Sequence, residues 1–80
     1  MSTEELINQG WKKYYECNCS GGIKQYFKNE QFNGFEVLIK PKNQVFRLLK
    51  NNHLVAGPDW LYKLPATMQE YGIWSPKETV

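Results

Sequence analysis

Few of the residues that build catalytic or metal centres occur in this chain. Its 80 residues include two cysteines and one histidine, whereas structural zinc sites commonly use four Cys and His ligands. Any Ser–His or Cys–His catalytic pair would depend on His53, and no catalytic motif surrounds that residue. A phosphate-binding loop of the G-x-x-x-x-G-K-S/T form is also missing. We therefore expect a protein that is not an enzyme and that carries no cofactor.

Long apolar segments are missing as well. The chain has no run of about 18 apolar residues, which excludes a transmembrane helix. Residues 1–10 have neither the basic region nor the apolar region of a signal peptide. We therefore expect a cytoplasmic protein that does not contact membranes and whose two cysteines are reduced.

Aromatic and basic residues, in contrast, are plentiful. Three Trp, five Tyr and four Phe make up 15% of the chain, and each can bury on the order of 150–250 Å². We expect one small domain over residues 1–74, followed by a flexible tail over residues 75–80. The net charge of +2 is uneven, because residues 11–50 carry eight Lys and Arg against three Glu, a balance of +5. The middle of the chain is therefore its basic part.

The spacing of apolar residues predicts an α+β fold. A short N-terminal helix is expected before Gly10, because Ser2 precedes Glu5 at the spacing of a capping box. Alternating, aromatic-rich runs separated by turn residues predict β-hairpins. The strands are expected at residues 11–18, 23–29, 35–40, 44–50 and 53–57. Together these runs predict a four- to five-stranded antiparallel meander.

A C-terminal helical segment is expected to cover one face of this sheet. Pro58 suits the first position of a helix, and Gly72 suits the position just after its end. Pro65 interrupts this stretch, because its ring displaces the carbonyl group four residues earlier. The sequence therefore predicts either a kinked helix or two short helices that meet near Pro65.

Lysines and tyrosines alternate in the first predicted hairpin. If its strands pair in simple register, one face carries Lys12, Tyr14, Lys24, Tyr26 and Lys28. The other face of the first strand is then expected to carry Trp11, Lys13, Tyr15 and Cys17. Such a Lys–Tyr face can neutralise phosphates and stack bases. Binding of single-stranded nucleic acid is therefore the alternative function that the sequence indicates.

Protein–protein contact is the leading expectation from the C-terminal aromatic residues. Small domains rich in Trp and Tyr use these side chains as interface anchors. The candidate binding residues there are Trp60, Tyr71 and Trp74, and Tyr62 and Ile73 lie close to them in the sequence. We expect a non-enzymatic binding or accessory domain whose partner is another protein or a second copy of the chain.

The stretch Cys17-Asn18-Cys19 raises the question of a metal site. Residues two apart on a strand point to the same side, so both thiols and His53 are the candidate ligands. Only three conventional soft ligands are then present, and a carboxylate or a water molecule would have to complete the site. We expect instead that these cysteines end a strand and enter a turn, without a metal.

Overall fold

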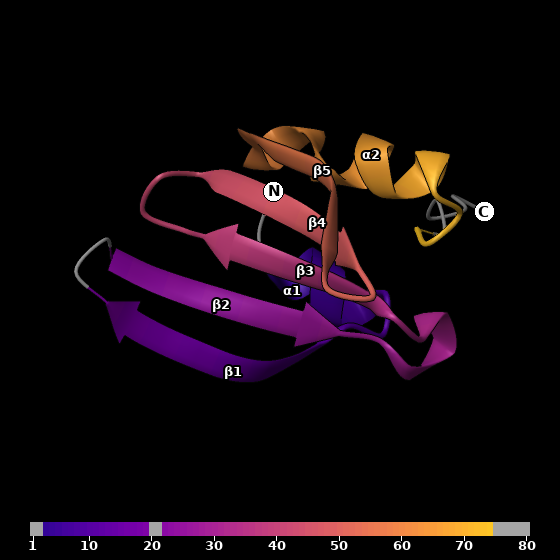
Figure 1. Ribbon diagram of the computed structural model, residues 1–80, viewed down its shortest axis with the longest axis horizontal. Helices are drawn as coiled ribbons and strands as arrows, with labels where there is room; N and C mark the ends of the chain where they lie inside the picture. Colours follow the sequence, from indigo (N-terminus) through magenta and orange to yellow (C-terminus); the bar gives the residue numbers. More distant parts are fainter. Residues whose placement is uncertain (1–2, 20–21, 75–80) are drawn as a thin grey trace.

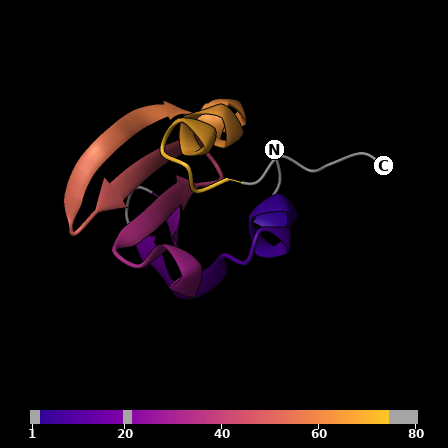
Figure 2. The same cartoon turned by 90° about the vertical axis from the view of Figure 1, so that its right-hand side faces the viewer.

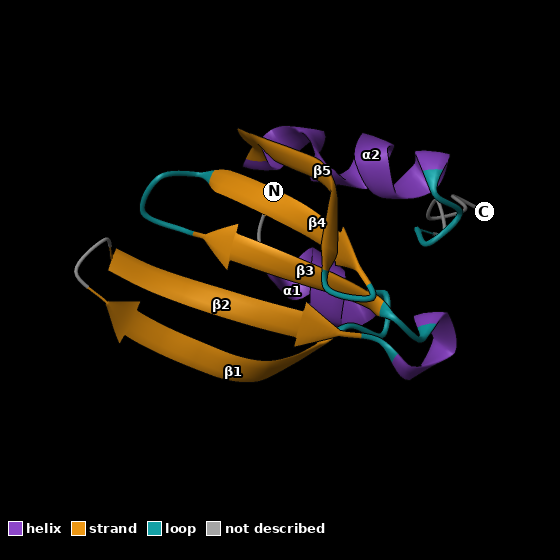
Figure 3. Ribbon diagram, viewed as in Figure 1, coloured by secondary structure: helices purple, strands orange, loops and turns teal. Residues whose placement is uncertain are grey.

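A five-stranded antiparallel sheet with helices against it makes up the protein (Figures 1 and 3). The structure, a computed structural model, describes residues 3–19 and 22–74, and of Cys19 only the backbone. The elements are α1 (Thr3–Asn8), β1 (Lys12–Cys19), β2 (Gly22–Lys28), η1 (Glu30–Phe32), β3 (Phe35–Lys40), β4 (Val45–Lys50), β5 (His53–Trp60), η2 (Leu61–Lys63) and α2 (Leu64–Glu70). The strands lie in the order β1-β2-β3-β4-β5. The predicted α+β meander is therefore confirmed, whereas Ser2 and the predicted tail over residues 75–80 lie outside the described residues.

Both helices lie on the same side of the curved sheet. Figure 2 shows α1 and α2 to the right of the strands, and Figure 1 looks at the opposite side, with α1 behind β3. We call the side toward the helices the inner face. The core fills the space between them and contains Leu6, Trp11, Phe27, Val37, Ile39, Phe46, Leu48, Leu61, Leu64, Met68 and Ile73.

Alternation along β3 and β4 decides which residues enter this core. Val37 and Ile39 pair with Leu48 and Phe46 across the two strands, and all four side chains are buried. Neighbouring residues such as Arg47 then point to the other side of the sheet. The strands predicted over residues 35–40 and 44–50 are therefore confirmed, with β4 beginning one residue later than predicted.

The two helices end in the same type of turn. After α1, the Trp11 N–H donates to the Leu6 carbonyl at 3.0 Å, and after α2 the Ile73 N–H donates to the Met68 carbonyl at 2.9 Å. Each bond crosses a glycine with a positive φ, Gly10 in the first turn and Gly72 in the second. This is the geometry of a Schellman motif. Its consequence is that the next side chain, Trp11 or Ile73, turns into the core.

The C-terminal helical segment begins later than the sequence predicts. Pro58 lies in β5, and this strand continues to Trp60, which pairs with Val45 of β4. The expectation of a helix start at Pro58 is therefore wrong, because pairing with a distant strand outweighs the local helix signal. Two short helical elements do follow, η2 and α2, and Pro65 lies in the first turn of α2, where its missing N–H costs little.

Candidate functional site

The face of the sheet opposite the helices is the most distinctive surface of the protein. We call it the outer face. On β1 to β4 it carries the side chains of Lys12, Tyr15, Cys17, Lys24, Tyr26, Lys28, Glu36, Leu38, Lys40, Val45, Arg47 and Leu49, as the register of the strands shows. Five of these residues are basic, and one is acidic. The +5 balance of residues 11–50 is thus concentrated largely on one side of the sheet.

A β-bulge in β1 changes which residues reach this face. Lys13 pairs with Phe27, and after a register shift Tyr15 pairs with Tyr26, so that Tyr14 is the extra residue. The ring of Tyr14 also lies on the outer side, 6.2 Å from the ring of Tyr26. The prediction that Tyr15 and Cys17 point away from Tyr14 is therefore wrong, because the bulge reverses the alternation beyond it.

Three tyrosines form a continuous aromatic surface as a result. The ring centres of Tyr15 and Tyr26 are 5.4 Å apart, and Tyr14 meets Tyr26 edge to face. Tyr14 is 49% exposed and Tyr15 is 54% exposed, whereas Tyr26 between them is half-buried. Two partly open rings therefore lie beside a third that supports them.

The hydroxyl group of Tyr14 donates a hydrogen bond to the Glu36 carboxylate on β3. Burial and this hydrogen bond raise the pKa of Tyr14 well above its ordinary value, so the phenol stays neutral. The ammonium group of Lys28 lies 4.5 Å from the centre of the same ring, which is a cation–π contact. Tyr14 is thus held in place from both sides, by Glu36 and by Lys28.

Lys12 and Lys28 are directly opposite each other on β1 and β2. Like charges in this arrangement repel. Among the residues that the structure describes, the ion pairs are Lys13–Glu16 and Lys63–Asp59, so neither Lys12 nor Lys28 has a carboxylate at salt-bridge distance. Lys28 is also directly opposite Glu36 on β3, so one carboxylate shares this part of the outer face with the two lysines, although not at salt-bridge distance.

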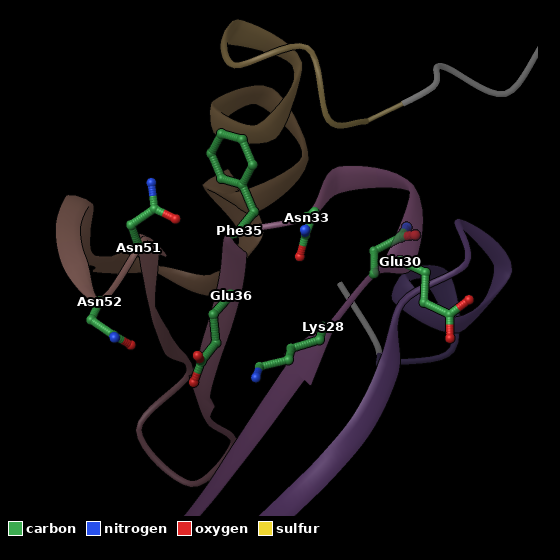
Figure 4. A pocket seen from close by; sticks show the side chains of 9 residues that line it. Lys28, Glu30, Asn33, Phe35, Glu36, Asn51 and Asn52 are labelled. Atoms are coloured by element: carbon green, nitrogen blue, oxygen red, sulfur yellow. The ribbon is translucent and has the colours of Figure 1, made fainter.

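Two adjoining hollows lie at this end of the sheet and share Lys28, Asn29 and Glu30. The larger, of about 510 Å³, is lined by Gly10, Lys12, Tyr14, Lys28, Asn29, Glu30 and Gln31. The other, of about 310 Å³, extends from Lys28 past Glu36 to Asn51 and Asn52 in the β4–β5 turn. Figure 4 shows this second hollow, with Lys28 and Glu36 extending from neighbouring strands.

Asn29 lines both hollows and connects them to the N-terminal segment through its hydrogen bonds. Its side chain is buried, accepts from the Gln31 N–H at 2.9 Å and donates to the Gln9 carbonyl at 3.1 Å. The first bond caps η1, as Asn commonly does at a helix start. The second ties η1 to the chain that leads into β1. The larger hollow therefore has a fixed wall beside Lys12 and Lys28.

The structure places all five predicted residues of the Lys–Tyr face, Lys12, Tyr14, Lys24, Tyr26 and Lys28, on the outer face. Sequence reasoning missed Tyr15 and the role of Glu36. The alternation of residues 35–40 indicates that Glu36 points away from Val37. Only the order of the strands in the sheet shows that Glu36 lies close to Tyr14. An Asn before Glu30 was a detectable signal for the cap formed by Asn29.

The predicted C-terminal aromatic residues differ in how far they are exposed and in what they contact. Trp60 on β5 is 54% exposed, and Tyr62 in η2 is 68% exposed. Tyr71 donates its hydroxyl to the Val55 carbonyl at 2.9 Å and contacts the ring of Phe35. Trp74 packs partly against the core. Trp60 and Tyr62 therefore remain as open aromatic side chains, whereas Tyr71 and Trp74 also stabilise the fold.

Two of the candidate metal ligands, Cys17 and His53, lie on different edges of the sheet. Cys17 lies on β1 and His53 on β5, which are the two edge strands of the sheet. Cys17 is disulfide-bonded, so the expectation of a reduced thiol is wrong for this residue. The side chain of Cys19 lies outside the described residues. Within the described part of the chain, no group of three or more His, Cys, Asp or Glu side chains gathers around a common point.

The helices of the described segments are too short and too polar to cross a membrane. Comparison of the chain with protein-family models, with curated protein sequences and with solved structures finds no match.

Proposed function

We propose that the protein binds single-stranded nucleic acid across the outer face of β1 and β2. The single observation that carries the proposal is the bulge in β1, which gathers Tyr14, Tyr15 and Tyr26 on the face that carries Lys12, Lys24 and Lys28. Proteins that bind single strands without sequence preference combine such stacking side chains with a basic surface. No helix covers this face in the described structure.

The chemistry assigns different roles to the two residue types. The exposed rings of Tyr14 and Tyr15 offer faces or edges on which bases stack, and stacking contributes about 1–3 kcal/mol per base. The three lysines neutralise phosphates. For a single strand, neutralising about three phosphates predicts a slope of roughly −2 for log affinity against log salt concentration. Affinity is then expected to fall about 20-fold between about 50 and 200 mM salt.

Fluorescence anisotropy with labelled single-stranded DNA and RNA tests the proposal. Tyr15→Ala is expected to weaken binding by about 5- to 150-fold, because one stacking side chain is lost. Lys24→Gln is expected to weaken binding and to make the salt slope shallower by about 0.7.

Lys13→Gln is the matched control. Lys13 is one residue from Lys12 but pairs with Phe27, so it lies on the inner side at the sheet edge. Its removal is expected to change binding less than Lys24→Gln does. If wild type shows no salt-sensitive binding, or if Lys24→Glu with Lys28→Glu binds unchanged, the proposal is wrong.

Contact with another protein is the second candidate function. The exposure of Trp60 and Tyr62, at 54% and 68%, favours it, because such side chains anchor interfaces. The partner would be a second copy or another protein. Light scattering tests the homodimer, which Trp60→Ala is expected to weaken. Affinity capture from the host tests another protein as the partner. This candidate function is contradicted if the protein is monomeric at every concentration and the Trp60→Ala and Tyr62→Ala variants capture the same host proteins as wild type.

The proposal describes a binding domain in the cytoplasm that does not catalyse a reaction. Both the location and the lack of catalysis stay predictions from the sequence, and the disulfide bond at Cys17 argues against the cytoplasm, where disulfides are rare. They rest on the apolar pattern of the chain and on its scarcity of catalytic residue types.

A further inference from the structure

We infer that the larger hollow, between Lys12 and Lys28, takes the terminal phosphate of the bound single strand. This inference rests on the proposed function and adds a preference for phosphorylated ends. The hollow has a volume of about 510 Å³, and its lining includes both ammonium-bearing side chains and the ring of Tyr14.

Charge is the first argument. Lys12 and Lys28 are opposite each other in the register of β1 and β2, and no carboxylate among the described residues lies within salt-bridge distance of either. A terminal phosphate carries about −1.5 to −2 at pH 7, whereas each internal phosphodiester carries about −1. The pair of lysines therefore matches a terminal group better than an internal one.

Two acidic groups lie near this pair of lysines. Glu36 is directly opposite Lys28 on β3 and reduces the positive charge there, but its carboxylate accepts the hydrogen bond from Tyr14, is not at salt-bridge distance from Lys28 and does not line the hollow. Glu30 lines the hollow and is exposed. The Glu30 carboxylate repels an anion in part. Lys12, Lys28 and Glu30 together give the lining of the hollow a net charge of about +1. A ligand with fewer negative charges therefore gains less from this lining.

Position is the second argument. The hollow lies where β1 begins and β2 ends, next to η1, beyond the pair formed by Tyr15 and Tyr26. Its wall is fixed, because the buried Asn29 side chain bonds to both Gln9 and Gln31. A strand that stacks on the tyrosines and runs toward this end meets that wall. The last phosphate of the strand is then the group placed between Lys12 and Lys28.

Competition binding with three oligonucleotides of one sequence tests the inference. One has a 5′-phosphate, one has a 3′-phosphate, and one has hydroxyl groups at both ends. We expect one of the two phosphorylated forms to bind wild type about tenfold more tightly than the unphosphorylated form, as one or two charge-assisted hydrogen bonds provide. Lys12→Gln and Lys28→Gln are each expected to abolish this gain.

Lys24→Gln is the matched control, because Lys24 lies on the same face but does not line the hollow. It is expected to weaken all three oligonucleotides alike and to keep the gain. Equal binding of the three oligonucleotides to wild type overturns the inference and leaves the proposed function in place. If none of the three oligonucleotides binds wild type, both the inference and the proposed function are wrong. Inorganic phosphate or a mononucleotide that competes as well as the phosphorylated strand also overturns the inference. Circular dichroism of each variant verifies that it is folded.

Discussion

Gly57 in β5 allows a sharp prediction about how the edge of the sheet is held. Its φ is +96°, and a Cβ atom there would lie 2.6 Å from the Phe46 carbonyl oxygen and 3.1 Å from the Arg47 Cα. Both atoms belong to the backbone of β4, which is paired on both sides. We expect Gly57→Ala to lower the free energy of unfolding by about 2–5 kcal/mol, from the positive φ and from overpacking.

Gly72 provides the matched comparison. Its φ is also positive, at +72°, but a Cβ atom there would meet nothing within 4 Å. Gly72→Ala therefore carries the conformational cost alone, about 1–2 kcal/mol. The difference between the two variants isolates the contact with β4 from the backbone strain that both share.

Urea denaturation followed by circular dichroism measures both variants. A loss of 1 kcal/mol corresponds to about 4–8 °C in Tm for a domain of this size, so Gly57→Ala is expected to melt about 8 °C or more below wild type. The dependence of the unfolding free energy on urea is expected to stay unchanged, because the same surface is exposed. Equal losses in the two variants would refute the reasoning, since the close approach of β4 would then cost nothing.

Three further predictions concern the core and the outer face. Phe27→Ala empties a fully buried position between sheet and helices and is expected to cost about 3–5 kcal/mol, measured by thermal unfolding. A loss below about 1 kcal/mol would show that this position is not packed. Lys12→Gln relieves the repulsion with Lys28 and is expected to raise the free energy of unfolding by about 0.2–1 kcal/mol, and a decrease would contradict the repulsion. Because burial and the hydrogen bond to Glu36 raise the pKa of Tyr14, its contribution to stability is complete below pH 10.0, its ordinary value, and is lost as the pH rises beyond it. Wild type is therefore expected to lose stability above that pH more steeply than Tyr14→Phe in urea denaturation, and equal slopes would contradict the role of this hydroxyl.

Much of the fold could be predicted because it depends on local patterns. The strand over residues 35–40 was predicted to the residue, since Phe35, Val37 and Ile39 recur with a period of two and Pro41 follows the run. The five residues of the Lys–Tyr face were predicted together, because lysine and tyrosine recur with a period of two. The prediction omitted Tyr15 because alternation alone contains no sign of a bulge.

The sequence by itself determined the order of the predicted helices and strands and the residues at several turns. These features follow from hydrophobic periodicity and from the conformations that glycine and proline allow. Only the tertiary structure decided the shift between Lys13 and Tyr15, the extension of β5 to Trp60 and the closure of the hollow by Asn29. Each of these depends on a partner distant in the chain, and one local pattern is compatible with more than one such partner. The outer face that supports the proposed function is therefore set by pairing between strands, which periodicity within one strand does not specify.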